Sequence, residues 1–298
     1  MDRRLSPPSC RFRATASVPR FVALLHVPEP YDFALSTERY RAFGTDLANL
    51  WHEGAFYRVV RGREVRISSA PGGVDVVPLN VAIGADVRTL LGTMFDLSAF
   101  ERFAEEDPVL ARLVVALRGF RPPINPDPFE TLVTSVTAQQ VSLRSASAVR
   151  NRLIQAFGRQ LRVAWEFPTA ERLARAQDAE LSALGFSQRK ASYVLGLARG
   201  RPVWDELHAL PDEEVKARLV QGRGLGEWTA DWFLARHLAR PGAWPAGDLG
   251  LVKAVALFYF DGARPTVKEM RAFGDRFAPF QNLTAHYLLT GARLAPAS

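Results

Sequence analysis

The sequence has almost no cysteine, and the single thiol, Cys10, stands near the amino terminus. One cysteine can form neither an internal disulfide framework nor the four-thiolate set that binds an iron–sulfur cluster. The five histidines are scattered, without the spacing of a metal site. No run approaches the about 20 apolar residues that cross a membrane. Residues 1–17 lack the apolar segment of a secretory signal, so a cytoplasmic protein is expected.

Positive charge is what the sequence has in excess. The 38 lysines and arginines outnumber the 31 acidic residues, giving a net charge of +7 and a pI near 10.0. This balance suits a polyanionic partner, although many basic proteins bind none. If the partner is nucleic acid, the protein is expected to associate with the nucleoid. At 298 residues, 48% of them hydrophobic, the chain has room for two or three folded domains.

The hydrophobic period changes once along the chain. After a basic and flexible tail at 1–17, alternation at period two over Phe56–Val60, Glu64–Ile67 and Val74–Val77 predicts a small antiparallel sheet with helical cover across 18–90. From about residue 90 the period becomes 3.6 and stays so, which predicts helices only across 91–298. Ser98–Leu117 reads as one amphipathic helix. Asp127 and Pro128 begin another, as N-cap and first helical residue. The expected fold class is α+β.

A glycine-rich turn, Gly222–Ala230, joins two predicted helices at about 212–238. Gly222, Gly224 and Gly226 alternate within it, which permits a tight turn with main-chain N–H groups exposed at a helix start. The dipole at that end favours anions, and a phosphate suits a basic chain. The other reading is an ordinary corner between two helices.

An aspartate and two tryptophans near this turn also allow two readings each. Asp248 ends a loop and precedes the predicted helix Leu249–Phe260, so it is either that helix's N-cap, a catalytic carboxylate or both. Trp228 and Trp232 are four residues apart and share a helix face. Rings at that spacing are usually core residues, but they could equally line a binding pocket.

Several stretches together resemble one known family. Gly222–Ala230 with Asp248 is similar to the hairpin and catalytic aspartate of the helix–hairpin–helix DNA glycosylase superfamily. Further stretches resemble its 3-methyladenine DNA glycosylase II branch, which repairs alkylated bases; they are Phe129–Val133, Ala138–Ser142, Leu184–Ala191, Gly247–Leu251 and Phe277–Phe280. The resemblance implies a TATA-binding-protein-like domain followed by two all-helical subdomains, with the active site between them.

The resemblance also implies a reaction and a pocket. Such enzymes flip a damaged base out of the duplex and cut its glycosidic bond, and Asp248 would stabilise the resulting positive charge on the sugar. Alkylated purines are already cationic, so no general acid is needed. Trp228 and Trp232 match the aromatic residues that stack on the base. A third pocket tryptophan of relatives falls at or near Leu289 here, and Gln281 and Asn282 stand where relatives often have arginine and serine.

Contacts with DNA follow from the same resemblance. Gln140 matches the residue that fills the gap left by the flipped nucleotide. The hairpin, through Gly222, Gly224, Gly226 and Thr229, would hold a phosphate. Arg144, Arg189 and Lys190 are further candidates for phosphate contacts, or ordinary surface charges. The main-chain carbonyls of Val220, Gly222 and Leu225 match those that bind a structural Na+ or K+ in relatives.

These observations predict a monofunctional DNA glycosylase of base excision repair, acting on alkylated bases such as 3-methyladenine and 7-methylguanine in double-stranded DNA. It would be a monomer that needs no cofactor, carries no iron–sulfur cluster and contacts no membrane. One alternative is a glycosylase with lyase activity on oxidised bases, which would place a lysine where this chain has Trp228. Another is a damaged-DNA-binding protein without catalysis.

Overall fold

A computed structural model describes residues 23–200 and 204–295. Its amino-terminal part is a five-stranded antiparallel sheet in the order β1-β5-β4-β3-β2. The predicted tail and residues 18–22 lie outside the described residues. The predicted α+β fold class is confirmed, and the three predicted inner strands are present. The strands are β1 (Ala23–His26), β2 (Leu50–His52), β3 (Ala55–Val60), β4 (Arg63–Ala70) and β5 (Gly73–Val77).

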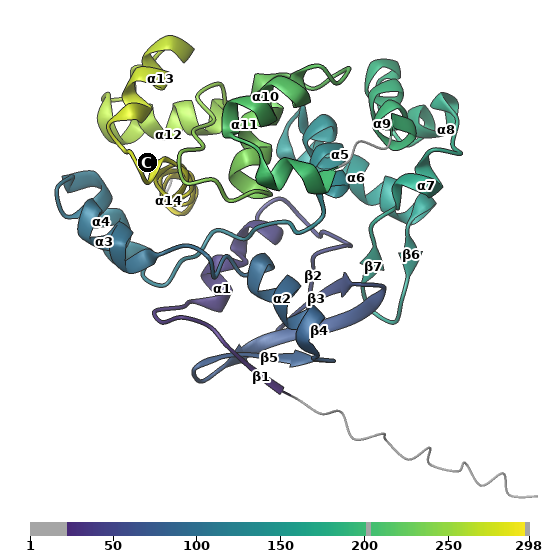
Figure 1. The fold of residues 1–298 in the computed structure, drawn as a ribbon, viewed down its shortest axis with the longest axis horizontal. Helices are drawn as coiled ribbons and strands as arrows, with labels where there is room; N and C mark the ends of the chain where they lie inside the picture. Colours follow the sequence, from purple (N-terminus) through teal and green to yellow (C-terminus); the bar gives the residue numbers. More distant parts are fainter. Residues whose placement is uncertain (1–22, 201–203, 296–298) are drawn as a thin grey trace, which may run out of the picture.

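Alternating burial holds this sheet against its helical cover. In β4, Val65 and Ile67 are fully buried while their neighbours face outward, as expected of a half-buried strand. They pack with Phe56 and with Ile83 and Val87 of α2 (Val81–Leu90). The short helices α1 (Phe33–Ser36) and η1 (Glu38–Tyr40) lie with α2 between the sheet and the larger helical layer (Figure 1).

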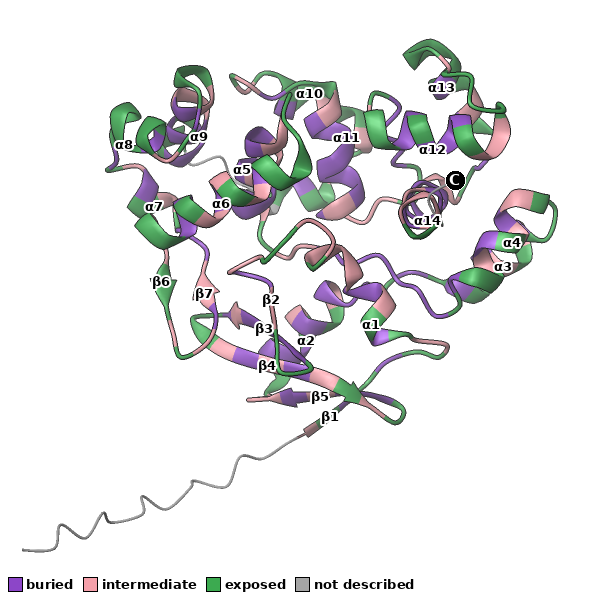
Figure 2. Ribbon diagram, turned by 180° about the vertical axis from the view of Figure 1, so that it is seen from behind, coloured by how far each residue is buried: buried purple, intermediate pink, exposed green. Residues whose placement is uncertain are grey.

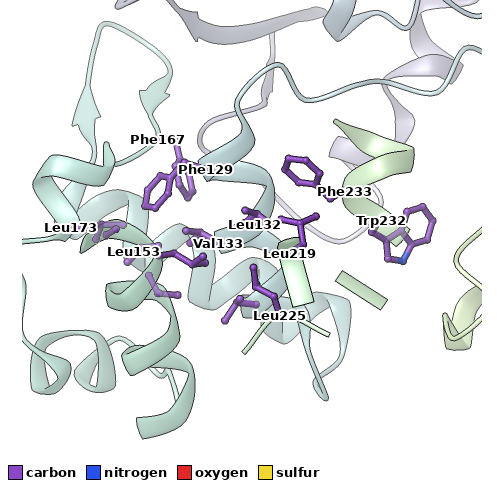
Figure 3. Close-up of a cluster of buried hydrophobic side chains, with 14 of the residues drawn as sticks. Phe129, Leu132, Val133, Leu153, Phe167, Leu173, Leu219, Leu225, Trp232 and Phe233 are labelled. Atoms are coloured by element: carbon purple, nitrogen blue, oxygen red, sulfur yellow. The ribbon is translucent and has the colours of Figure 1, made fainter. Parts of the chain in front are cut away.

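The first helical core is built from the middle of the chain. Figure 3 shows Leu132, Val133, Leu153, Leu173 and Leu225 packed together between helices. The helices are α5 (Pro128–Ala138), α6 (Leu143–Phe157), α7 (Ala170–Leu173), α8 (Asp178–Ala183), α9 (Gln188–Gly200), η2 (Trp204–Ala209), α10 (Asp212–Val220) and α11 (Glu227–Arg236).

The second helical core joins segments far apart in sequence. It combines α3 (Leu97–Ala104) and α4 (Pro108–Ala116) with α12 (Leu249–Tyr259), α13 (Val267–Asp275) and α14 (Gln281–Leu294). Phe100 lies 4.8 Å from Tyr287, centroid to centroid, and the Tyr287 hydroxyl donates to the carbonyl of Phe120 at 3.0 Å. Both α12 and α14 carry buried residues, which are purple in Figure 2.

Two predictions about secondary structure are wrong. The predicted helix Ser98–Leu117 is two helices, because Asp107 caps a new one by accepting from the N–H groups of Val109 and Leu110, and Pro108 occupies its first position. The region predicted to be wholly helical also contains a short hairpin, β6 (Arg159–Gln160) and β7 (Trp165–Glu166). The loop of this hairpin is held by the sheet domain, where Glu64 accepts from the N–H groups of Val163 and Ala164 at 2.6 and 2.9 Å.

Candidate active site

The glycine turn between α10 and α11 has the geometry that its sequence predicts. Gly224 has a φ of +86°, and a Cβ there would lie 2.2 Å from the ring of Tyr193. Gly226 caps α11, and a Cβ there would meet nothing within 4 Å. The first N–H groups of α11 have no acceptor within the helix. The turn therefore presents an open helix start to solvent, with Gly224 required by both its conformation and its close packing.

Side chains from two other helices hold this turn in place. Gln139, just after α5, donates from Nε2 to the carbonyl of Gly224 at 2.9 Å. Lys190 of α9 donates from Nζ to the carbonyls of Thr137 and Gln139 at 2.9 and 2.6 Å. These bonds place Lys190 at the carboxyl end of α5, where a cation is favoured. Two of its three donors are used internally, so one donor is left for the predicted phosphate contact, which stays a prediction.

Asp248 is held by three hydrogen bonds from two helices. Its Oδ1 accepts from the N–H of Leu251 at 2.9 Å, so it is the N-cap of α12. Its Oδ2 accepts from the indole Nε1 of Trp228 at 2.9 Å and of Trp232 at 3.0 Å. A carboxylate offers about four lone-pair positions, so one remains for a further partner. The two readings of Asp248, helix cap and cleft carboxylate, are both compatible with this geometry.

The two tryptophans differ in how far they are exposed. Trp228 is partly exposed, but Trp232 is only 2% exposed. The guanidinium of Arg236 lies 3.4 Å from the ring centroid of Trp232, and His286 meets the same ring edge-on at 5.7 Å. These neighbours correct the prediction that the face of Trp232 is open for stacking. The N–H of its indole, rather than its face, is directed at Asp248.

Asp248 lies in a cleft of about 1230 Å3 that involves all parts of the fold. The sheet domain contributes Arg39 and Tyr40, and α14 contributes Leu289, which is partly buried. A Cβ on Gly250 would come within 3.0 Å of Oδ1 of Asp248 and 3.2 Å of Cδ2 of Leu289. Asp248 and Leu289 therefore share one edge of the cleft. The apolar side chain of Leu289 lies where the resemblance implies a third pocket tryptophan in relatives.

The remaining predicted residues, which lie around this cleft, differ in how far they are exposed. Gln140 is exposed at its mouth with a φ of +55°, a conformation that non-glycine residues rarely adopt. Arg144 and Arg189 are exposed. Thr229 is only 1% exposed and its hydroxyl lies 3.4 Å from Nε2 of Gln139, so its predicted part in the phosphate site would have to come from its main chain.

The predicted cation site, formed by the main-chain carbonyls of Val220, Gly222 and Leu225, is less open than the resemblance implies. The carbonyl of Gly222 accepts from the N–H of Leu225 at 3.0 Å. Val220 is the last residue of α10, so its carbonyl has no partner within that helix. Carbonyl oxygens suit hard cations, and the three carbonyls come from one turn. The residues present are thus compatible with a monovalent cation. Within 23–200 and 204–295, His, Cys, Asp and Glu form no group of three or more that could hold a metal ion.

A buried ionic network forms one wall of the cleft. Glu130 of α5 accepts from Arg58 of β3 at 2.6 Å and from Arg150 of α6 at 2.5 Å. Arg150 also contacts Asp46. The network joins the sheet domain to the first helical core. The charges of its two arginines are balanced by those of its two carboxylates. Sequence analysis missed it because its members are far apart in the chain and carry no common spacing.

Sequence comparison identifies the class to which this site belongs. Residues 133–279 match the HhH-GPD superfamily base excision DNA repair protein family. Over these residues, which include the turn, Trp228 and Asp248, the chain belongs to that superfamily. No helix of the described residues is both long and apolar enough to cross a membrane.

Individual relatives narrow the similarity to 3-methyladenine DNA glycosylases. The glycosylase of Bacillus subtilis (strain 168) is 29% identical over 201 residues, which are 65% of this chain and 66% of that protein. The structure of the Archaeoglobus fulgidus enzyme has a TM-score of 0.82, covers 94% of this chain and 100% of its own, and is 24% identical. A Schizosaccharomyces pombe enzyme in complex with abasic DNA has a TM-score of 0.58 and is 28% identical over 64% of this chain and 95% of its own.

Proposed function

We propose that this chain is a monofunctional DNA glycosylase that hydrolyses the bond between an alkylated base and its deoxyribose in double-stranded DNA. Its substrates would include 3-methyladenine and 7-methylguanine. The observation that carries the proposal is Asp248, fixed by two indole N–H groups and a helix start at the edge of a cleft large enough for a base. The superfamily match and the named relatives support the reaction class.

The geometry of Asp248 accounts for how hydrolysis would proceed. The glycosidic bond breaks with its electron pair going to the departing base, and the sugar carbon becomes positively charged. Asp248 faces this developing charge with a fixed orientation, which needs no reorganisation during the reaction. Water then adds to the carbon, and the proton that it loses passes to Asp248 or to solvent. An alkylated purine leaves as a neutral base, so no acid is required.

DNA would be held at the open turn and at the mouth of the cleft. Main-chain N–H groups at Gly224 and Gly226 suit a phosphate, and Arg144 and Arg189 are exposed for further phosphates. Gln140, held in its unusual conformation at the mouth, would occupy the space left by the flipped nucleotide. The S. pombe relative, whose structure is in complex with abasic DNA, supports DNA as the ligand. The protein would act as a monomer without a cofactor.

A monovalent cation would support the turn rather than the chemistry. The carbonyls of Val220, Gly222 and Leu225 would bind Na+ or K+, which fixes the turn for a phosphate without entering the reaction. Exchanging K+ for the larger tetramethylammonium ion at constant ionic strength should then weaken DNA binding. If affinity is the same in both salts, the turn needs no cation.

The rival functions predict different products. A glycosylase with lyase activity needs an amine beside the sugar, and position 228 holds a tryptophan already bonded to Asp248. A damaged-DNA-binding protein needs no fixed carboxylate in the cleft. Incubation with methylated duplex DNA, followed by chromatography of free bases, separates the three readings. Release of free base without strand cleavage is expected.

Asp248→Asn provides the matched control for that experiment. Asparagine caps helices about as well as aspartate, so α12 should be retained. A charge pair at about 4 Å gains roughly 3 kcal/mol more at an effective dielectric near 20 than in water. Base release should therefore slow by about a hundredfold under single-turnover conditions. Release at the rate of the unchanged protein would contradict the proposed function.

A further inference from the structure

The residue before Gln140 joins the mouth of the cleft to the glycine turn. Helix α5 ends at Ala138, and Gln139, its C-cap, leaves the helix with a ψ of 131°. The side chain of Gln139 is half-buried, and its Nε2 donates to the carbonyl of Gly224 at 2.9 Å. One side chain therefore links the end of α5 to the turn that precedes α11.

Two contacts made by α9 complete a ring around this link. Lys190 donates from Nζ to the carbonyl of Gln139 at 2.6 Å. Three residues further along α9, on the same helix face, the ring of Tyr193 packs so closely on Gly224 that a Cβ there would lie 2.2 Å from it. The end of α5, the glycine turn and α9 are thus each in contact with the other two. A closed set of contacts of this kind fixes the relative position of its three members.

Gln140 follows directly and has a backbone conformation that needs support. Its φ of +55° is rare for a residue other than glycine, and such a conformation persists only where the surroundings fix it. Lys190 holds the carbonyl of the peptide bond that joins Gln139 to Gln140. On the other side, Ser142 caps α6 by accepting from the N–H of Ser145 at 3.2 Å. The exposed side chain of Gln140 therefore projects from a backbone that is held on both sides.

We propose that Gln139 is a positioning residue that holds Gln140 and the glycine turn as one rigid unit. The inference rests on the proposed glycosylase function and concerns its nucleotide-flipping step. In that function the turn holds a backbone phosphate, and Gln140 occupies the space left by the flipped nucleotide. Because the amide of Gln139 fixes one against the other, the phosphate contact sets the point at which Gln140 enters the duplex. Gln139 acts through these two groups rather than on the reacting bond.

An ordinary anchor of a helix end uses the same kind of bond. Arg199, also on α9, donates to the carbonyls of Ala174 at 3.1 Å and Ala176 at 2.7 Å, just after α7. These bonds support the fold at a different helix end from the one that carries Gln140. Loss of an anchor lowers the stability of the fold and affects all substrates alike, whereas loss of a positioning contact affects flipping alone. Arg199 is therefore the matched comparison.

Two duplexes with the same lesion separate flipping from bond cleavage. Both carry 7-methylguanine, which is paired with cytosine in one and lies opposite a tetrahydrofuran abasic analogue in the other. The unpaired nucleotide is extruded at lower cost, so it depends less on Gln140. Gln139→Met keeps the length of the side chain but removes the donor. At saturating enzyme, this variant should slow base release at least tenfold from the paired duplex and less than threefold from the unpaired one.

Three further variants test the same ring of contacts. Gln139→Asn, whose amide is one carbon shorter, keeps the polarity of the site and should give the same difference between the two duplexes. Lys190→Met, which releases the carbonyl of Gln139, should give it too, since saturating enzyme removes the effect of any lost phosphate contact. Arg199→Met removes as many bonds to main-chain carbonyls as Lys190→Met, and it should leave both rates unchanged.

The possible failures are separable. If the unchanged protein releases base from neither duplex, the proposed function itself is wrong. If it releases base from both, but Gln139→Met and Gln139→Asn slow the two duplexes equally or not at all, the function stands and this inference is overturned. A difference between the duplexes that also arises in Arg199→Met would mean that any weakened helix end has this effect, and would overturn the inference as well.

Discussion

The indole of Trp228 meets Asp248 through its N–H, with Nε1 lying 2.9 Å from Oδ2. This contact gives the tryptophan a second role beside the stacking that the resemblance implies. Trp232 donates to the same oxygen at 3.0 Å, so two rings of one helix orient one carboxylate. Because Asp248 also caps α12, its position depends on both helices that border the cleft.

The first prediction separates orientation from stacking. Trp228→Phe keeps an aromatic face but removes the N–H donor. A hydrogen bond to a charged group contributes about 1.5–3 kcal/mol, so base release should slow by roughly ten- to a hundredfold. Binding of lesion DNA should change little, since the ring is retained. Single-turnover rates and titration of binding check the two effects. Trp165→Phe, outside the cleft, is the control, and an unchanged rate for Trp228→Phe would leave only the stacking role.

The second prediction concerns the turn. A Cβ at Gly224 would lie 2.2 Å from the ring of Tyr193, and the φ of +86° adds strain. Gly224→Ala should therefore destabilise the protein by about 1–3 kcal/mol and weaken DNA binding. Gly242→Ala, where a Cβ meets nothing within 4 Å, should be nearly neutral. Chemical denaturation and DNA titration measure the two quantities. Full DNA affinity in Gly224→Ala would remove the turn from the DNA interface.

The third prediction is that borohydride traps no covalent complex with DNA. The resemblance implies that a lyase would carry its lysine at position 228, where this chain has a tryptophan. Lys253 of α12, however, lines the cleft and is exposed. A complex that the unchanged protein forms and that disappears in Lys253→Ala would contradict the prediction and assign the attack to Lys253. Denaturing electrophoresis after borohydride treatment gives the readout. A complex that persists in Lys253→Ala would mean that another amine attacks the sugar.

The fourth prediction uses the ionic wall. Burial would raise the pKa of Asp46, but the charge of Arg150 and a hydrogen bond from Asn49 outweigh it and hold the pKa below its ordinary value. Such a carboxylate stabilises the fold at neutral pH, and the contribution disappears as pH falls through the depressed pKa. Asp46→Asn should cost about 3 kcal/mol of unfolding free energy at pH 7. The difference from the unchanged protein should shrink as pH falls below about 4.

Urea denaturation at several pH values measures this difference directly. Asp275→Asn, exposed at the end of α13, is the matched control and should cost less than about 0.5 kcal/mol at every pH. A loss in Asp46→Asn that stays constant down to pH 3 would mean that hydrogen bonding rather than charge is responsible.

Local signals in the sequence were sufficient to predict most of the helices and strands. Asp127 and Asp248 cap the helices that they were predicted to begin, because a side-chain oxygen before an apolar pattern satisfies orphan N–H groups whatever surrounds it. The alternation in β3, β4 and β5 likewise reflects a sheet with one covered face. These features depend on neighbours within a few residues, so they can be predicted from the sequence.

Features that depend on distant partners could not be predicted in this way. The hairpin of β6 and β7 has two residues in each strand and is held by Glu64, about a hundred positions earlier. The bonds of Lys190 to the carbonyls of Thr137 and Gln139 could not be predicted either, because those residues are 53 and 51 positions earlier in the chain. Arg236, which covers one face of Trp232, is by contrast only one helical turn away, so this contact can be expected from the sequence.

The second helical core places α3 and α4 against α12 and α14, so the segment after the sheet domain packs on the end of the chain. During synthesis, the apolar faces of α3 and α4 are made long before their partners, and the whole first helical core emerges in between. One side of the cleft can thus close only after α12 and α14 have been made. Until then the apolar faces of those two helices are without their partners, and such exposed apolar surface is prone to aggregate.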